Sequence, residues 1–346
     1  MESNIKVGHP FYFPTQVVLL DDDPDFLEGV SLMLRRDLSY KLFQSAHSAL
    51  EYVNSAHQQV QFLQRCYSSY KTGPAESDAL SHIDINKIHL EVLNGARFQT
   101  CSTVIVDYSM PEMNGLEFLM SVKNPYIKKI LLTGQADMEL AVTAFNKQLI
   151  DQFIDKHDPR LKTRLNSAIA CFQEQYFSSS YKLITDPILA NNHDAFLIDA
   201  DFQTFFKELR AKLQCVEYYM IDTPHAGFLM VDAKGEKSCL LVYTPDALAT
   251  HYQALSRAKA PASLLRAVRD GKLLPSFDDQ DSFSGAQDPR IRAWKDSYFP
   301  GYTIAAGRTF HTTIIPDEHL ASVHQQSIIA YADFLQANCS INEVVH

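Results

Sequence analysis

The sequence has no apolar run that approaches the roughly 18 residues needed to cross a bilayer. Its first residues, MESNIKVGHPFYF, lack the basic-then-apolar pattern of a secretion signal. The six cysteines show no CxxC spacing, which argues against a zinc site and against a disulfide framework. These absences predict a cytoplasmic protein with reduced thiols and no membrane partner.

Positive charge is also scarce. The formal net charge is −10, with 16 Lys and Arg against 21 Asp and Glu in residues 1–177, and 15 against 20 in residues 178–346. A nucleic-acid binder is expected to carry an excess of positive charge. This argues against DNA as the partner without excluding a small local basic face. The length of 346 residues is enough for two domains with full hydrophobic cores.

Residues 14–177 alternate strand-like and helix-like patterns. The strand-like runs are nearly continuous in apolar residues, as in QVVLL at residues 16–20. Five such βα units predict an α/β domain with a doubly wound, five-stranded parallel sheet covered by helices on both faces. Between the second helix and the third strand, residues 58–100 exceed what a short connection needs. Their periodicity predicts a helical insert on the side of this domain.

The pattern changes after a polar segment, residues 178–186, which is typical of a linker. Beyond it, strand-like runs cluster, and Lys234 with Gly235 marks a hairpin turn between two of them. This predicts a second domain over residues 187–346, an α+β fold with a mostly antiparallel sheet. The expected strands cover 216–222, 227–235, 237–244, 302–307 and 309–316, and the expected helices cover 202–213, 246–258, 262–271 and 319–336.

Five polar side chains follow apolar strands at their C-terminal ends. They are Asp21, Asp22, Asp107, Thr133 and Lys156. A parallel sheet gathers these strand ends along one edge, where ligands bind, so the five should meet. Crowded carboxylates raise one another's pKa unless a cation holds them. Mg²⁺ is the usual cation where phosphoryl groups are handled. The neighbouring Asp23 is expected to cap the following helix.

The motifs around these residues, LLDDDPD, VDYSMPEMNG, LLTG and FIDK, resemble the receiver domain of two-component response regulators. The resemblance implies that Asp107 accepts a phosphoryl group from a sensor histidine kinase. It implies that Asp21, Asp22 and Asp107, with the backbone carbonyl of Ser109, hold Mg²⁺. It also implies no enzymatic activity beyond the chain's own phosphorylation and dephosphorylation.

The same resemblance assigns the parts of a conformational switch. The hydroxyl of Thr133 would bond to the new phosphate, and Lys156 would pair with it. Phe153 would turn inward together with Thr133, although an apolar residue at this position is also typical of static core. Gly134 would leave space for the phosphate beside Thr133.

The switched form is expected to dimerise. The face implied by the resemblance consists of the helix at 137–147, the strand that ends at Lys156 and the helix that follows Asp158. One position departs from the family pattern. The lysine is usually followed by proline, whereas His157 stands here, which puts the geometry of this loop in question.

The two-domain layout and the insert resemble the response regulators of α-hydroxyketone quorum sensing, the LqsR type. That resemblance implies a quorum-sensing phosphorelay and an output domain similar to nucleotide-binding domains. One alternative is a nucleotide or metabolite sensor. Another is a DNA-binding regulator that uses the helical hairpin 246–274, although basic residues in such a hairpin more often form a solvated face. The basic residues are Arg257, Lys259, Arg266, Arg269 and Lys272.

Overall fold

The chain folds into two compact units, each assembled from three separate stretches. We call residues 13–65, 95–183 and 331–346 the receiver unit, and residues 1–12, 66–94 and 184–330 the output unit. The computed structural model describes residues 8–55, 66–71, 79–134, 138–180, 196–222, 226–276, 297–305, 308–320 and 326–339, together with positions 62, 182, 184, 186 and 188. No helix within these residues is long and apolar enough to span a bilayer.

The receiver unit contains a five-stranded sheet in the order β3-β2-β6-β7-β8. All neighbouring strands pair in parallel. This is the flavodoxin-like, doubly wound sheet that the sequence predicts, and the fold class is confirmed. The strands are β2 (Gln16–Leu20), β3 (Ser39–Phe43), β6 (Cys101–Asp107), β7 (Lys128–Thr133) and β8 (Gln152–Asp155).

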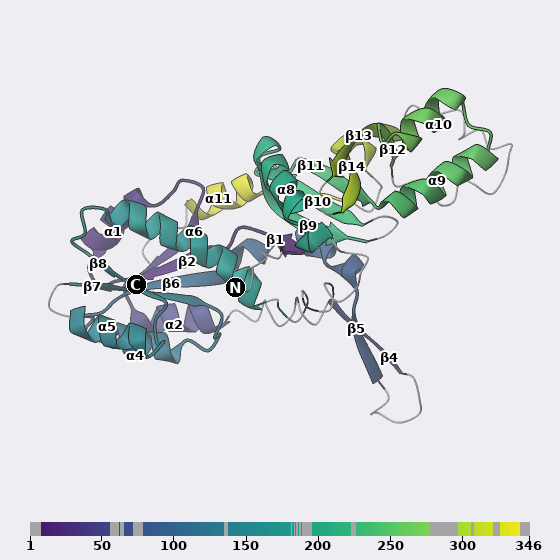
Figure 1. Ribbon diagram of the computed structural model, residues 1–346. Coiled ribbons are helices and arrows are strands. Elements are labelled where there is room, and N and C mark those ends of the chain that lie inside the picture. The colour runs from purple at the N-terminus through teal and green to yellow at the C-terminus, as the bar shows by residue number, and fades with distance from the viewer. Residues whose placement is uncertain are drawn as a thin grey trace. The chain divides into compact units, whose positions relative to one another are not determined.

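Helices cover both faces of the receiver sheet. Figure 1 shows α1 and α6 on one face and α2, α4 and α5 on the other. The side chains of β2, α1 and α6 share a buried apolar cluster that includes Val17, Leu27 and Leu165. The predicted linker 178–186 begins inside α6, and its positions 181, 183 and 185 lie outside the described residues. The helices are α1 (Pro24–Met33), α2 (Ala46–Ser55), α4 (Gly115–Ser121), α5 (Met138–Asn146) and α6 (Leu161–Ser180).

The output unit contains a seven-stranded antiparallel sheet in the order β1-β9-β10-β11-β14-β13-β12. The predicted antiparallel sheet of the second domain is thereby confirmed. Gly235 has φ of +86° in the predicted turn between β10 and β11, a value that favours glycine. The strands are β1 (Phe11–Tyr12), β9 (Cys215–Ile221), β10 (Gly227–Asp232), β11 (Lys237–Tyr243), β12 (Leu273–Pro275), β13 (Tyr298–Ala305) and β14 (Thr309–Pro316).

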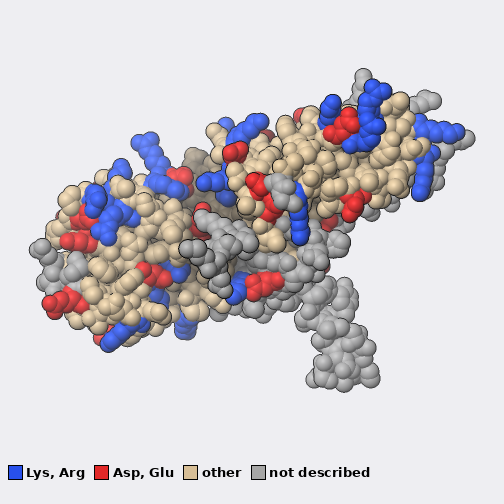
Figure 2. All heavy atoms as spheres, in the orientation of Figure 1, with Lys and Arg blue, Asp and Glu red and all other residues tan. Residues whose placement is uncertain are grey.

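Among the described residues, the α-helices α8 (Ala200–Lys212), α9 (Pro245–Arg257) and α10 (Ala262–Arg269) accompany this sheet. Helix α8 packs through Phe206, whose ring stacks on Phe228 at a centroid distance of 4.5 Å. Helices α9 and α10 form the predicted hairpin, joined by the turn 258–261. On the face drawn in Figure 2, Lys and Arg side chains gather over this hairpin.

The insert differs from the helical prediction. Its described residues form a hairpin of β4 (Tyr67–Lys71) and β5 (Ala79–Ile83), then the 3₁₀ helices η2 (Ile85–Lys87) and η3 (His89–Leu93). Both 3₁₀ helices contact β9, and Ile88 and Val92 are buried. The expected helix is therefore wrong here, because burial against the output sheet outweighs the local helical period. Positions 58–61, 63–65 and 72–78 lie outside the described residues.

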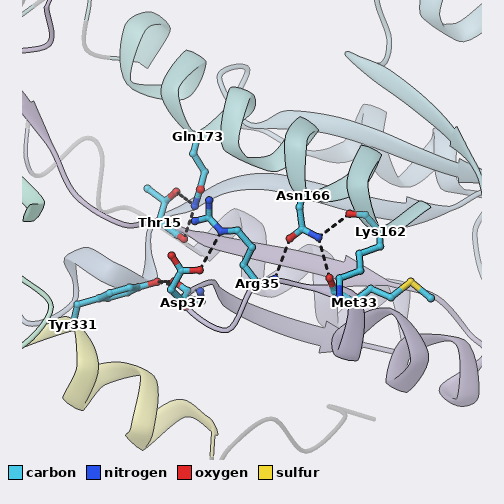
Figure 3. Close-up of polar contacts among 9 residues, drawn as sticks. Thr15, Met33, Arg35, Asp37, Lys162, Asn166, Gln173 and Tyr331 are labelled. Carbon is cyan, nitrogen blue, oxygen red and sulfur yellow. Dashed lines mark hydrogen bonds and ion pairs between the residues drawn. The ribbon is translucent and has the colours of Figure 1, made fainter. Parts of the chain in front are cut away.

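The last helix, α11 (Tyr331–Cys339), belongs to the receiver unit. The Tyr331 hydroxyl donates to the Asp37 carbonyl at 2.8 Å and accepts from the Ser39 amide at 3.1 Å (Figure 3). Its ring and that of Phe334 pack on Phe98, with centroid distances of 5.0 and 5.3 Å. The predicted helix 319–336 is wrong over 326–330, which are not helical, and 321–325 lie outside the described residues.

Candidate functional site

The loop after β2 fixes the first carboxylate of the candidate site. Asp21 is buried, and its Oδ1 accepts the Asp23 amide at 3.1 Å. Asp23 caps α1 by accepting the amides of Asp25 and Phe26, so its predicted capping role is confirmed. Asp22, between them, is exposed. The turn thus presents one buried and one exposed carboxylate at the strand end.

The loop after β6 fixes the second buried carboxylate. Oδ2 of Asp107 accepts the Ser109 amide at 3.1 Å. The chain then enters α4 through a capping box, in which Asn114 accepts the Glu117 amide and Glu117 accepts the Asn114 amide. The Gly115 amide donates to the Tyr108 carbonyl at 3.0 Å. This reciprocal capping holds the loop that carries Asp107 against the sheet.

Lys156 joins the two loops. Its Nζ lies 2.7 Å from Oδ2 of Asp21 and 2.8 Å from Oδ1 of Asp107. It also lies 4.3 Å from the ring centroid of Phe26, a cation–π contact. The structure therefore brings together Asp21, Asp22, Asp107 and Lys156, as expected from their places at the strand ends.

The electrostatics of the cluster depend on burial and on this lysine. Burial raises the pKa of Asp21, and the hydrogen bond and charge of Lys156 oppose that rise without cancelling it. Burial alone would lower the pKa of Lys156, but hydrogen bonds and charges from Asp107 and Asp21 outweigh it, so this pKa is raised. Lys156 is therefore a permanent cation at neutral pH, and it neutralises part of the carboxylate charge.

The acidic cluster fits a hard divalent cation. Asp21, Asp22 and Asp107 each offer a carboxylate oxygen, and these oxygens lie within 4.8 Å of one another. Oδ2 of Asp21 is buried, and among the described residues its contact is the Lys156 ammonium. A donor set of oxygens with excess negative charge is what Mg²⁺ binds. When bound, the ion would offset charge on phosphoryl oxygens.

The expected switch residues lie at the same sheet edge but do not all point at the carboxylates. Thr133 is buried, and its hydroxyl donates to the Gly134 carbonyl at 3.1 Å. A Cβ on Gly134 would meet no described atom within 4 Å, so the space beside Thr133 is open. Phe153 is half-buried and makes an edge contact with Phe145 at 6.1 Å.

Two residues of the site escape sequence reasoning. Phe26 packs against the apolar cluster of the receiver unit, and its ring also lies close to the Lys156 ammonium, a contact that no motif indicates. Gly115 is the second, because a Cβ there would lie 2.2 Å from the Asp107 carbonyl oxygen and 3.1 Å from Leu131 Cδ1. In the sequence, this glycine is indicated only by its place in the MNG turn of the VDYSMPEMNG motif. Only glycine lets α4 approach the strand end that carries Asp107.

Gly115→Ala should destabilise the receiver unit by roughly 1–3 kcal/mol, because the methyl group meets backbone that cannot move aside cheaply. Amide hydrogen exchange of β6 in the full chain measures this local free energy. Gly29→Ala is the matched control. A Cβ on Gly29, within α1, meets nothing within 4 Å. It should stabilise by about 1 kcal/mol through helix propensity. Equal effects of the two substitutions would contradict the steric explanation.

The chain is similar over its whole length to a solved structure, that of the Legionella pneumophila response regulator LqsR. The two share 29% identity over 98% of each chain, with a TM-score of 0.77. An adenylate cyclase from Rhodopirellula baltica matches 49% of this chain and 97% of its own (21% identity, TM-score 0.33). A receiver domain protein from Clostridium thermocellum matches 46% and 95% (20% identity, TM-score 0.30). No protein-family model and no curated protein matches the sequence.

The likeness to LqsR spans both units, whereas the other two are too weak to bear on function. The chain is therefore an LqsR-like response regulator with a receiver domain, as its strand-end motifs indicate.

Proposed function

We propose that this response regulator is switched by phosphorylation of Asp107 within a quorum-sensing phosphorelay. The observation that carries the proposal is the position of the Asp107 carboxylate, 2.8 Å from the Lys156 ammonium and within the acidic cluster. The Asp107 oxygen would attack the phosphorus of a histidine kinase's phosphohistidine. The bond from phosphorus to the histidine nitrogen breaks as the new acyl phosphate forms.

The residues around Asp107 are suited to phosphoryl transfer, which depends on positioning and on charge stabilisation. Asp21 and Asp22 would hold Mg²⁺ together with Asp107 and the Ser109 carbonyl. The Lys156 ammonium already contacts Asp107 and would pair with a phosphoryl oxygen after transfer. A phosphoryl group adds negative charge to the site. The Lys156 ammonium and Mg²⁺ would therefore interact with more negative charge after transfer than before it.

The same event would bias a conformational equilibrium. In the structure the Thr133 hydroxyl donates to the Gly134 carbonyl, and turning it to the phosphate would exchange that hydrogen bond for a charge-assisted one. Phe153 would move with it, away from its contact with Phe145 on α5. Phosphate therefore gains contacts in one conformation that it lacks in the other, which shifts the population.

The readout we propose is a homodimer through α5, β8 and α6. Helix α5 exposes three large apolar side chains: Leu140 (48%), Val142 (41%) and Phe145 (46%). Val142 and Phe145, three positions apart, lie side by side on this helix and form an exposed apolar patch, which favours association with another protein surface. Phe145 also contacts Phe153, so the patch is directly connected to the switch strand.

Size-exclusion chromatography with and without beryllofluoride and Mg²⁺ tests this readout. Beryllofluoride, an analogue of the phosphoryl group, should shift the chain from monomer to dimer. Val142→Asp should abolish the shift, because it places a charge in the apolar patch. Met120→Asp is the matched control, since Met120 on α4 is 59% exposed and lies outside the patch. An unchanged elution, or equal loss in both variants, would count against the proposed dimer.

A further inference from the structure

The hairpin of α9 and α10 concentrates positive charge in a chain that is otherwise acidic. Residues 257–272 hold five basic side chains and one acidic one, a net charge of +4. The whole chain carries −10, so the remainder carries −14. We call the basic residues the hairpin cluster, and all are exposed: Arg257, Lys259, Arg266, Arg269 and Lys272. Figure 2 shows Lys and Arg gathered over this end of the output unit.

The fold presents these side chains outward from a fixed scaffold. Helix α10 buries Leu264 and Val268 and leaves Ala262, Ser263 and Arg266 exposed. The turn before it places Lys259 at a φ of +56°, and Gly271, at +66°, places Lys272 just beyond the helix. The exposed face of α10 thus carries small residues at its beginning and arginines towards its end.

Helix-end stabilisation explains only part of this cluster. Basic side chains in the last turn favour a helix through its dipole, and Arg257, Arg266 and Arg269 occupy such positions. Lys259 and Lys272 lie outside the helices. Arg269 pairs with Asp270 at 3.2 Å. The other four basic residues form no ion pair with any residue that the structure describes, so their charge is available to a partner.

The surroundings favour a nucleic acid over an acidic protein as that partner. Residues 245–276, all of which the structure describes, include no large apolar side chain that is exposed. Protein interfaces depend on buried aromatic or aliphatic anchors, which this surface lacks. Nucleic-acid interfaces are instead polar and positively charged. Two helices joined by a four-residue turn, 258–261, are also the elements from which helix-turn-helix DNA-binding motifs are built.

We infer that the hairpin cluster binds the phosphate backbone of double-stranded DNA, with α10 against the duplex. The inference does not depend on phosphorylation of Asp107. Small exposed residues at the start of α10 let the helix approach the groove, and the flanking cations contact phosphates on either side.

Fluorescence anisotropy of the full, unphosphorylated chain with a labelled duplex of mixed sequence tests the inference. The double variant Arg266→Glu with Arg269→Glu should weaken binding by at least about tenfold. Its plot of log affinity against log salt should be shallower by about 2, because each lost phosphate contact removes roughly 0.9 from the slope. The matched control is Lys207→Glu with Lys212→Glu, which makes the same charge change on exposed positions of α8.

Retention of binding in the α8 variant and loss in the α10 variant supports the inference. Equal loss in both would show an effect of net charge alone and would overturn it. Undetectable binding of the duplex at low salt would also overturn the inference. Binding of polyglutamate but not of the duplex would overturn it too, because it would assign the surface to an acidic protein. Circular dichroism melts of both variants check that each still folds. A second variant, Lys259→Ala with Lys272→Ala, keeps the test valid if the first fails to fold.

Discussion

Asp107→Asn should abolish phosphoryl transfer to this chain. The wild-type chain, given a small acyl phosphate donor and Mg²⁺, should gain the mass of one phosphoryl group. The asparagine variant should gain none, because its amide is not a nucleophile, and Asp21, the other carboxylate beside Lys156, is buried with its Oδ1 held by the Asp23 amide. Intact-mass spectrometry reads the outcome directly, and peptide mapping places the group.

Asp155→Asn is the matched control for that loss. Asp155 ends β8 next to Lys156, but its carboxylate accepts the His157 amide and lies outside the acidic cluster. This variant should gain the phosphoryl group as the wild type does. Phosphorylation that persists in Asp107→Asn, or that maps to another side chain, would contradict the assignment of Asp107.

The C-terminal ends of the receiver strands can be predicted from the sequence, because a parallel sheet is buried on both faces. A strand covered on both faces is continuous in apolar residues, so the first polar residue marks its end. Leu20, Asp107 and Thr133 end β2, β6 and β7 as predicted, and β8 ends at Asp155, one residue before the prediction. The meeting of the carboxylates with Lys156 follows from this topology alone.

Contacts within the site depend on distances that no local pattern encodes. Position 115 needs glycine because a Cβ there would lie 2.2 Å from the backbone carbonyl oxygen of Asp107, across the loop. The hydroxyl of Thr133 turns to its own neighbour's carbonyl, a choice between rotamers that the sequence leaves open. Phe26 fits a helical core pattern equally well whether or not a lysine lies over its ring.

The assignment of segments to units is the largest feature that the sequence does not reveal. The insert has helical periodicity, yet Ile88 and Val92 are buried beside β9, far away in the chain. The strand β1 has two residues, too few for any periodic signal. An amphipathic helix such as α11 shows that it packs on something but does not identify its partner. Tertiary burial decides all three cases.

The predicted second domain, residues 187–346, should therefore fail to fold when produced alone. It lacks β1, which covers the edge of β9, and it lacks the insert residues that pack on β9. The buried side chains of Phe11, Ile88 and Val92 are lost with them. Their burial is worth roughly 5–9 kcal/mol in total. That is comparable with the whole stability of a domain, about 5–15 kcal/mol. A thermal melt followed by circular dichroism should show no cooperative transition.

A full chain with a protease site between residues 183 and 184 provides the control. Each unit contains segments from both sides of this cut, because β1 and the insert lie before it and α11 lies after it. The two halves should therefore stay together after cleavage, elute as one species and separate only in denaturant. Mixing separately purified halves should restore the cooperative melt. Halves that separate under native conditions, or a fragment 187–346 that melts like the full chain, would show that the second half folds independently of the first.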